Sequence, residues 1–168
     1  AFHYRHDGGG YFSTSTHQID GDSRVEVIRA ELDLDKTNLT IRDSGRDLIY
    51  GRFERFTRKP DIDYKVVDDT AIIEYVAGDL TYLGGAIKIS GDSDNEWYVR
   101  FSEDTPLLLN CSGRESDMHM NFATTPLRRL SLEADDSYIY LKLGDLEPLV
   151  TVDVRGEGSS LKLRVPEG

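Results

Sequence analysis

The stretch that decides the fold runs from residue 106 to residue 163 and states one unit three times: PLLLNCSGRESDMHM (residues 106–120), PLRRLSLEADDSYIYLKL (126–143) and PLVTVDVRGEGSSLKL (148–163). Each unit opens on a proline, and the prolines lie 20 and then 22 residues apart. In each unit an alternating apolar run leads through a short polar or glycine-bearing corner into a second alternating run. A spacing of two places side chains on one face of a strand. A repeat of about 20 residues with this pattern predicts stacked two-strand rungs, each burying its apolar face against the next.

Residues 31–41 repeat the same strand, corner and strand. The segment from Val25 to Leu32 also fits one face of a helix, but the clustered β-branched residues and the clean alternation favour strands. Residues 47–54 are a further strand, with Gly51 as a β-bulge. Residues 63–75 predict a hairpin that turns at Asp68 and Asp69. Residues 95–101 predict a strand, with Trp97, Val99 and Phe101 on one face.

The chain suits one domain, which can bury roughly two-thirds of its unfolded surface. Residues 1–22 are polar and predict a tether or an edge segment, and residues 23–168 predict a single all-β domain. Residues 77–96 are punctuated by glycines and are expected to form an irregular insertion around one short strand at 87–89. The expected architecture is a β-solenoid-like stack of two-strand rungs in two layers. A β-sandwich is the alternative, because it carries the same alternation.

The net charge of −11 argues against nucleic acid as a partner, because a phosphate backbone requires a cationic patch. Solubility is the ordinary use of such a surface, and a cation-bridged contact with an anionic envelope polymer is the alternative. No run approaches the roughly 20 apolar residues of a membrane helix, and no signal peptide is recognisable. Since the chain begins at Ala1 without a methionine, we expect a fragment or a mature chain, in which membrane attachment would need an anchor absent from this sequence.

The sequence contains no G-x-S-x-G elbow, P-loop or dinucleotide-binding fingerprint that follows a predicted strand. The single cysteine, Cys111, ends an apolar run and is expected to be a buried structural thiol. His119 lies between two inward methionines and is expected to face solvent. His3 and His6 with Asp7 suggest metal ligands, but a polar tether explains them better.

Acidic pairs could serve as a glycosidase dyad across a groove, although acidic corners ordinarily keep a β-stack soluble. The candidates are Asp61/Asp63, Asp68/Asp69, Asp92/Asp94/Glu96 and Asp135/Asp136. Asp92, Asp94 and Glu96 also offer oxygen ligands for Ca²⁺, but they lack the loop spacing of an EF-hand. We therefore expect a plain polar loop there, with no metal and no cofactor.

Four aromatic residues are candidates for a contact surface: Trp97, Tyr98, Tyr138 and Tyr140. Outward tyrosines on a flat β-face suit carbohydrate or protein contacts, and a second buried layer is the alternative explanation.

Three segments carry a resemblance to a known family: Asn95-Glu96-Trp97, the entry from Asp104 to Leu107, and the closing residues 159–166. Together with the recurrent units, they resemble the toastrack-type domains of bacterial envelope proteins, which include the C-terminal regions of LiaF-like and PspC-like stress-response proteins and the "putative adhesin" families. The resemblance covers roughly residues 23–168. The family's corners typically contain Gly-Ala-Gly or Gly-Ala-Ser, and here only the last unit keeps the glycines.

The resemblance implies a β-solenoid-like stack without catalytic residues, tethered beside membrane helices and associated with envelope-stress sensing, adhesion or protein contacts. We therefore expect a non-catalytic, extracytoplasmic module of the cell envelope that contacts a protein partner or a cell-surface polymer. Uncovered end rungs also favour homo-oligomers. The alternative function is a carbohydrate-binding or carbohydrate-active protein that uses carboxylates on a β-face.

Overall fold

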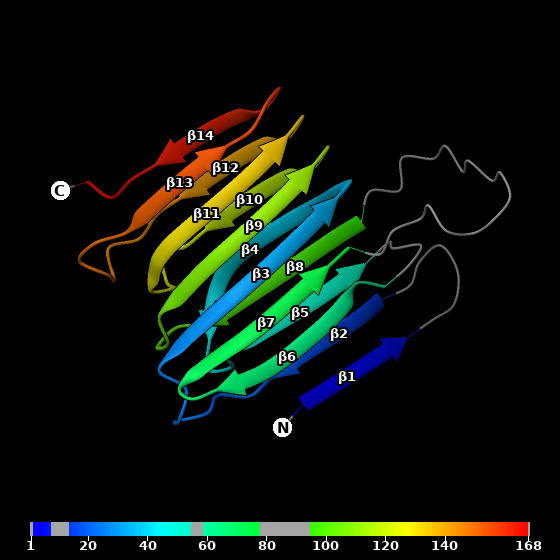
Figure 1. Cartoon of the computed structure of the whole chain (residues 1–168), viewed down its shortest axis with the longest axis vertical. Helices are drawn as coiled ribbons and strands as arrows, with labels where there is room; N and C mark the ends of the chain where they lie inside the picture. Colours follow the sequence, from blue (N-terminus) through cyan, green and yellow to red (C-terminus); the bar gives the residue numbers. More distant parts are fainter. Residues whose placement is uncertain (1, 8–13, 55–58, 78–94, 168) are drawn as a thin grey trace, which may run out of the picture.

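The protein consists of two β-sheets packed face to face (Figure 1). The structure is a computed structural model that describes residues 2–7, 14–54, 59–77 and 95–167. Within these ranges every regular element is a strand, so none contains a helix suited to crossing a bilayer.

One sheet has six strands in the order β13-β11-β9-β3-β7-β6 and the other has eight in the order β1-β2-β5-β8-β4-β10-β12-β14. The strands of the six-stranded sheet are β3 (Val27–Asp35), β6 (Asp61–Val67), β7 (Thr70–Val76), β9 (Leu107–Arg114), β11 (Leu127–Asp135) and β13 (Thr151–Arg155). The strands of the eight-stranded sheet are β1 (Phe2–Asp7), β2 (Thr14–Ile19), β4 (Thr37–Gly45), β5 (Ile49–Glu54), β8 (Asn95–Ser102), β10 (Asp117–Asn121), β12 (Tyr138–Lys142) and β14 (Ser160–Arg164).

Successive strands of each predicted unit lie in opposite sheets and form one rung, and neighbouring rungs pair in parallel. The rungs are β3/β4, β9/β10, β11/β12 and β13/β14, and β7/β8 forms a fifth beside β3/β4. The register aligns Leu32 with Cys111, Cys111 with Leu132, and Leu132 with Val154, so the inward residues of each rung lie over those of the next. The predicted β-solenoid-like stack is confirmed.

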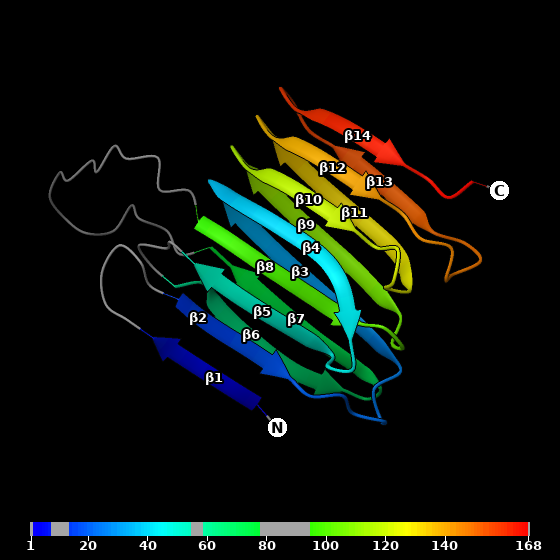
Figure 2. The same cartoon turned by 180° about the vertical axis from the view of Figure 1, so that it is seen from behind.

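The two ends of the stack are built differently (Figures 1 and 2). At one end, antiparallel strands cover the β7/β8 rung: β6 pairs with β7, β5 with β8, β2 with β5, and β1 with β2. At the other end, β13 and β14 are the last strands of their sheets. We call these the closed end and the open end.

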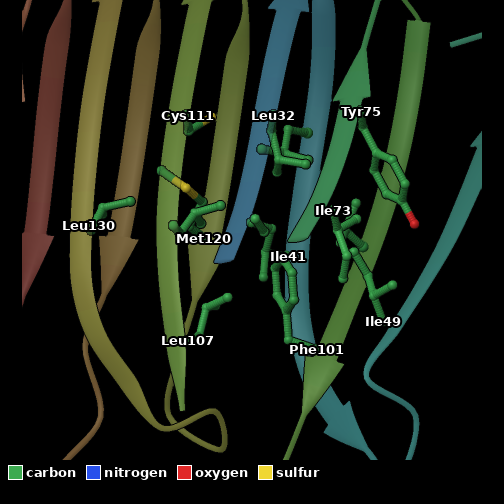
Figure 3. Packing of buried hydrophobic residues seen from close by; sticks show 14 of the residues in the cluster. Leu32, Ile41, Ile49, Ile73, Tyr75, Phe101, Leu107, Cys111, Met120 and Leu130 are labelled. Atoms are coloured by element: carbon green, nitrogen blue, oxygen red, sulfur yellow. The ribbon is translucent and has the colours of Figure 1, made fainter. Parts of the chain in front are cut away.

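The core fills the space between the sheets, and Figure 3 shows side chains from both sheets pointing into it. Met120 and Phe101 come from the eight-stranded sheet and Leu107 and Cys111 from the six-stranded one, and all four are buried. Each fully buried aliphatic or aromatic side chain stabilises the fold by about 1.5–3 kcal/mol relative to exposure. The predicted inward faces of the three proline-led units are therefore correct, although the last unit is only partly buried.

In the four rungs whose corners the structure describes, a residue of positive φ occupies the equivalent place between the two strands. The equivalent residues are Lys36 (φ 46°), Glu115 (φ 48°), Asp136 (φ 47°) and Gly158 (φ 65°). One residue separates the strands of β3/β4, two separate those of β9/β10 and of β11/β12, and four separate those of β13/β14. Lysine and glutamate rarely adopt a positive φ, so the residue types at positions 36 and 115 did not indicate a left-handed turn.

A ladder of hydroxyl groups supports these corners, and we call it the hydroxyl ladder. Thr37, Ser116, Ser137 and Ser159 follow the turn residues. The backbone N–H of Thr37 donates to Ser116 Oγ at 3.1 Å, that of Ser116 to Ser137 Oγ at 3.1 Å, and that of Ser137 to Ser159 Oγ at 2.9 Å. The hydroxyls of Thr37, Ser116 and Ser137 each donate to the carbonyl two residues back, and Ser159 Oγ donates to the Ala134 carbonyl at 2.8 Å. The ladder satisfies buried polar groups that the tight turn removes from the strand pairing.

Two further sequence expectations are settled differently. Gly51 continues the regular register of β5 with both neighbours, so the predicted bulge is wrong. A Cβ at Gly51 would lie 2.8 Å from the Phe53 ring and 3.1 Å from the Tyr75 ring, so the glycine makes room for these rings. The predicted insertion lies mostly outside the described residues, as does the short strand at 87–89, while Asn95 and Glu96 begin β8.

The polar N-terminal segment contributes β1 and β2 to the eight-stranded sheet. Ser15, His17 and Ile19 of β2 are buried. A domain boundary at residue 22 stays a prediction.

Candidate contact surfaces

The open end exposes apolar side chains that the repeat normally buries. Leu161 and Leu163 of β14 are 46% and 48% exposed, whereas their register partners in β12, Ile139 and Leu141, are 1% and 0% exposed. Nearby Leu149 is also exposed. Because β13 and β14 each pair along one edge only, a row of backbone donors and acceptors is available on the other edge.

The closed end contains a buried aromatic cluster behind the antiparallel strands. The rings of Phe53 and Tyr75 meet edge to face at 5.2 Å, and Trp97 packs on Phe53 at 5.3 Å. His17 Nδ1 lies 2.6 Å from the Tyr75 hydroxyl oxygen. Burial lowers the pKa of His17 to about 4 and raises the pKa of Tyr75. Both groups are thus neutral near pH 7, and both are fully buried.

The outer face of the eight-stranded sheet carries a row of polar and aromatic side chains across six neighbouring strands, which we call the cross-strand row. Its members are joined by strand register: Lys162 (β14), Tyr140 (β12), His119 (β10), Thr40 (β4), Tyr98 (β8) and Arg52 (β5). None of these side chains is buried. The row therefore connects the open end to the closed end on the solvent face.

Cations and rings are in contact along this row. His119 stacks on Tyr140 with ring centroids 6.0 Å apart. Lys162 Nζ and the Arg164 guanidinium carbon each lie 5.9 Å from the centroid of Tyr140. Arg52 similarly lies 5.7 Å from the centroid of Tyr98, so rings order the cations on this face.

Three cations near the open end have no carboxylate partner within the part of the chain that the structure describes. Lys142, Lys162 and Arg164 form no salt bridge with any residue that the structure describes. Lys142 and Arg164 are register partners, and Lys162 is two residues from Arg164 on β14. We call these three residues the basic patch.

The outer face of the other sheet is rich in carboxylates. They come from several strands of the six-stranded sheet: Glu31, Asp33, Asp61, Asp63, Glu74, Glu133, Asp135 and Asp153. The two outer faces therefore differ in charge, with cations and rings prominent on one and carboxylates on the other.

A shallow groove of about 260 Å³ lies on the eight-stranded sheet near the closed end. It is lined by Asn38, Thr40, Arg52, Glu54, Glu96, Trp97 and Tyr98. Glu54 and Glu96 are cross-strand partners, and Arg52 forms a 3.1 Å ion pair with Glu54. The groove thus places two carboxylates side by side on the same sheet.

The four aromatic residues singled out from the sequence do not form one surface. Tyr138 and Tyr140 lie on the outer face of β12, and Tyr98 lies on β8, with β4 and β10 between these strands. Trp97 is only 2% exposed and packs in the core, apart from its contribution to the groove. Its alternation with Val99 and Phe101 already indicated an inward position. Sequence reasoning missed the basic patch, whose only signal is Lys or Arg at alternate positions of the last two units.

The remaining candidates are placed as follows. His119 is exposed, as predicted. Cys111 is buried, and burial raises the pKa of its thiol to about 12, with a smaller contribution from Asp33. The thiol is therefore protonated, which fits the predicted structural role.

The acidic pairs and the metal candidates lie partly outside the described residues. Among the described residues, no group of three or more His, Cys, Asp or Glu side chains is arranged to hold a metal ion. Asp92 and Asp94 lie outside the described residues, and Glu96 lies in β8. Asp61 and Asp63 lie on β6, and Asp68 occupies the β6–β7 turn with φ 55°.

Comparisons with known proteins agree with this architecture. The chain superposes on a solved structure from Clostridium sporogenes ATCC 15579, described as a "putative cell adhesion protein", with a TM-score of 0.83 and 19% identity over 94% of this chain and 74% of that one. At this identity the likeness shows the fold. No curated protein matches the chain significantly. The family model for the N-terminal domain of toast_rack, DUF2154, matches residues 9–159. Since that match spans most of the stack, from β2 to the corner of the last rung, the chain belongs to the toast_rack N-terminal domain family.

Proposed function

We propose that this protein is a non-catalytic module of the bacterial cell envelope that senses or adheres by presenting its β-surfaces to a partner. In this proposal the module is extracytoplasmic and a membrane anchor holds it in the full-length protein. The toast_rack family and the adhesion description of the similar Clostridium structure support the assignment.

The observation that carries the proposal is the asymmetry of the stack. Each sheet ends in an edge strand at both ends of the stack, β1 and β6 at the closed end and β14 and β13 at the open end. At the open end, the inward-facing leucines of β14 are also half-exposed. A partner that adds strands to such an edge gains backbone hydrogen bonds and buries apolar side chains together. The open end is therefore the proposed site of contact with a protein, including a second copy of this chain.

Site-specific photo-cross-linking in cells that express the full-length protein tests this proposal. A photoreactive residue at Leu163 should give discrete adducts of higher mass, and an adduct of twice the mass would identify a second copy. The matched control is Val67, which is equally exposed at 48% but lies at the closed end. Absence of adducts at Leu163, or equal adducts at both positions, contradicts a role for the open end.

A second candidate function is carbohydrate processing at the shallow groove, favoured by the neighbouring carboxylates of Glu54 and Glu96. If the groove hydrolyses glycosidic bonds, the wild type should release reducing ends from polysaccharides, and Glu54→Gln and Glu96→Gln should abolish the release. If no substrate is cleaved by the wild type, this candidate fails and the contact function stands.

A further inference from the structure

The basic patch has a charge opposite to that of the whole molecule. The chain carries a net charge of −11, yet Lys142, Lys162 and Arg164 stand together without a carboxylate partner among the described residues. We propose that the outer face of the eight-stranded sheet binds a linear acidic polysaccharide, laid across the strands along the cross-strand row. This inference rests on the proposed contact function and names its polymer partner, on a surface other than the apolar edge of the open end.

The dimensions of the row favour a linear polymer over a small anion. From Lys162 to Arg52 the row makes five steps between adjacent strands. At about 4.8 Å a step, these residues span roughly 24 Å, enough for several sugar units. The sequence of strands is uninterrupted, so one chain can contact the basic patch, pass His119 and Thr40, and end at Tyr98.

Electrostatics favour an anionic occupant. Lys142 and Arg164 lie directly opposite each other on neighbouring strands, and Lys162 is the next outward residue on β14. Like charges in register on a sheet destabilise it, and a carboxylate between them relieves this repulsion. Because the rest of the molecule repels polyanions, attraction is confined to faces where cations gather.

The hydrogen-bonding groups of the row match a hydroxyl-rich chain. Tyr140 of the row and Tyr138 beside it each offer a hydroxyl that donates and accepts, as sugar hydroxyls do. Ammonium and guanidinium groups only donate and so fit carboxylates. A single-stranded nucleic acid would need open ring faces for base stacking. Here the face of Tyr140 stacks on His119, and two cations lie near the same ring. The row also lacks the aliphatic side chains that insert into a lipid surface.

Isothermal titration calorimetry with polygalacturonate, which carries one carboxylate on each sugar, tests the proposal. The patch variant is Lys142→Gln/Lys162→Gln/Arg164→Gln. The matched control is Arg29→Gln/Lys65→Gln/Arg129→Gln, which removes three exposed cations from the outer face of the six-stranded sheet, also without salt bridges among the described residues. Both variants lose the same charge. We expect the wild type to bind, the patch variant to bind on the order of tenfold more weakly, and the control to bind within about twofold of the wild type.

The wild type alone gives an independent measurement, because methyl-esterified polygalacturonate has the same sugar backbone without its charge. It should bind far more weakly, and added salt should weaken binding of the charged form. The proposal is overturned by a wild type that does not bind polygalacturonate, by equal losses in both variants, or by equal binding of the methyl ester. It is also overturned if poly-L-glutamate, single-stranded DNA or anionic vesicles bind the patch as tightly. If polygalacturonate does not bind but photo-cross-links form at Leu163, the polysaccharide proposal is wrong and the proposed contact function still holds.

Discussion

At the scale of single residues, the hydroxyl that follows each corner has two tasks. Ser116 Oγ donates to the Arg114 carbonyl at 2.8 Å and accepts the N–H of Thr37 at 3.1 Å, and the side chain is 2% exposed. One small side chain thus closes its own turn and links its rung to the next. Alanine could do neither, while threonine already occupies the equivalent place at Thr37.

Ser116→Ala should therefore destabilise the protein by about 1–3 kcal/mol, because it leaves a buried N–H and a carbonyl without a partner. Urea unfolding followed by circular dichroism measures the change. Ser116→Thr should recover most of the loss, and Ser159→Ala should cost less because Ser159 is exposed at the open end. Equal stability of Ser116→Ala and the wild type would show that the hydroxyl ladder does not stabilise the fold.

His17 gives the closed end a pH dependence. Its pKa falls from an ordinary 6.5 to about 4 on burial, so the unfolded chain binds a proton between these values and the folded chain does not. The contribution of neutral His17 to the free energy of unfolding is therefore full above pH 6.5. It falls as the pH drops toward 4, by about 2 kcal/mol at pH 4.5. Urea unfolding at several pH values from 7.5 to 4.5 gives the free energy of unfolding as a function of pH. This free energy should fall less steeply with decreasing pH for His17→Gln than for the wild type. Identical slopes would contradict this assignment.

At the scale of elements, the sequence predicts those strands whose alternation is regular. The three proline-led units and residues 31–41 became four rungs in the predicted way, and the hairpin at Asp68 formed as expected. In each case period-two alternation and a polar corner sufficed, because each rung buries one face only.

The fifth rung could not be predicted in the same way. Its strands, β7 and β8, are separated by residues 77–94, so no unit of about 20 residues is visible. Its partner, β3/β4, is also remote in sequence from β9/β10, which lies on the other side. The basic patch could not be predicted for a related reason. Lys142 and Arg164 are neighbours only through the register between β12 and β14, and the periodicity along one strand does not indicate that register.

The position of a rung in the stack should decide the cost of a core substitution. Leu141 and Leu163 are register partners, yet Leu141 is 0% exposed and Leu163 is 48% exposed. Leu141→Ala should therefore cost about 2–5 kcal/mol, because it opens a cavity, and Leu163→Ala about 1 kcal/mol or less. Urea unfolding of the two variants measures both costs. Comparable losses would show that the last rung is packed as tightly as the interior ones.

At the scale of the whole molecule, the stack has a direction. The β7/β8 rung is buttressed by antiparallel strands, and the β13/β14 rung meets solvent along two edges. In a stack of repeats each rung is stabilised mainly by its neighbours, so a rung with one neighbour opens at lower free energy than the others. The edge that lowers local stability is also available to a partner, as are the edges of β1 and β6 at the closed end.

Native-state hydrogen exchange, on protein diluted until light scattering shows a monomer, tests this asymmetry most directly. The paired amides of β13 and β14 should exchange before those of β3, β4, β7 and β8, which should exchange last, near the free energy of global unfolding. Protection in β13 and β14 equal to that in β3 and β4 would contradict the account, because the end proposed for contact would then already be closed.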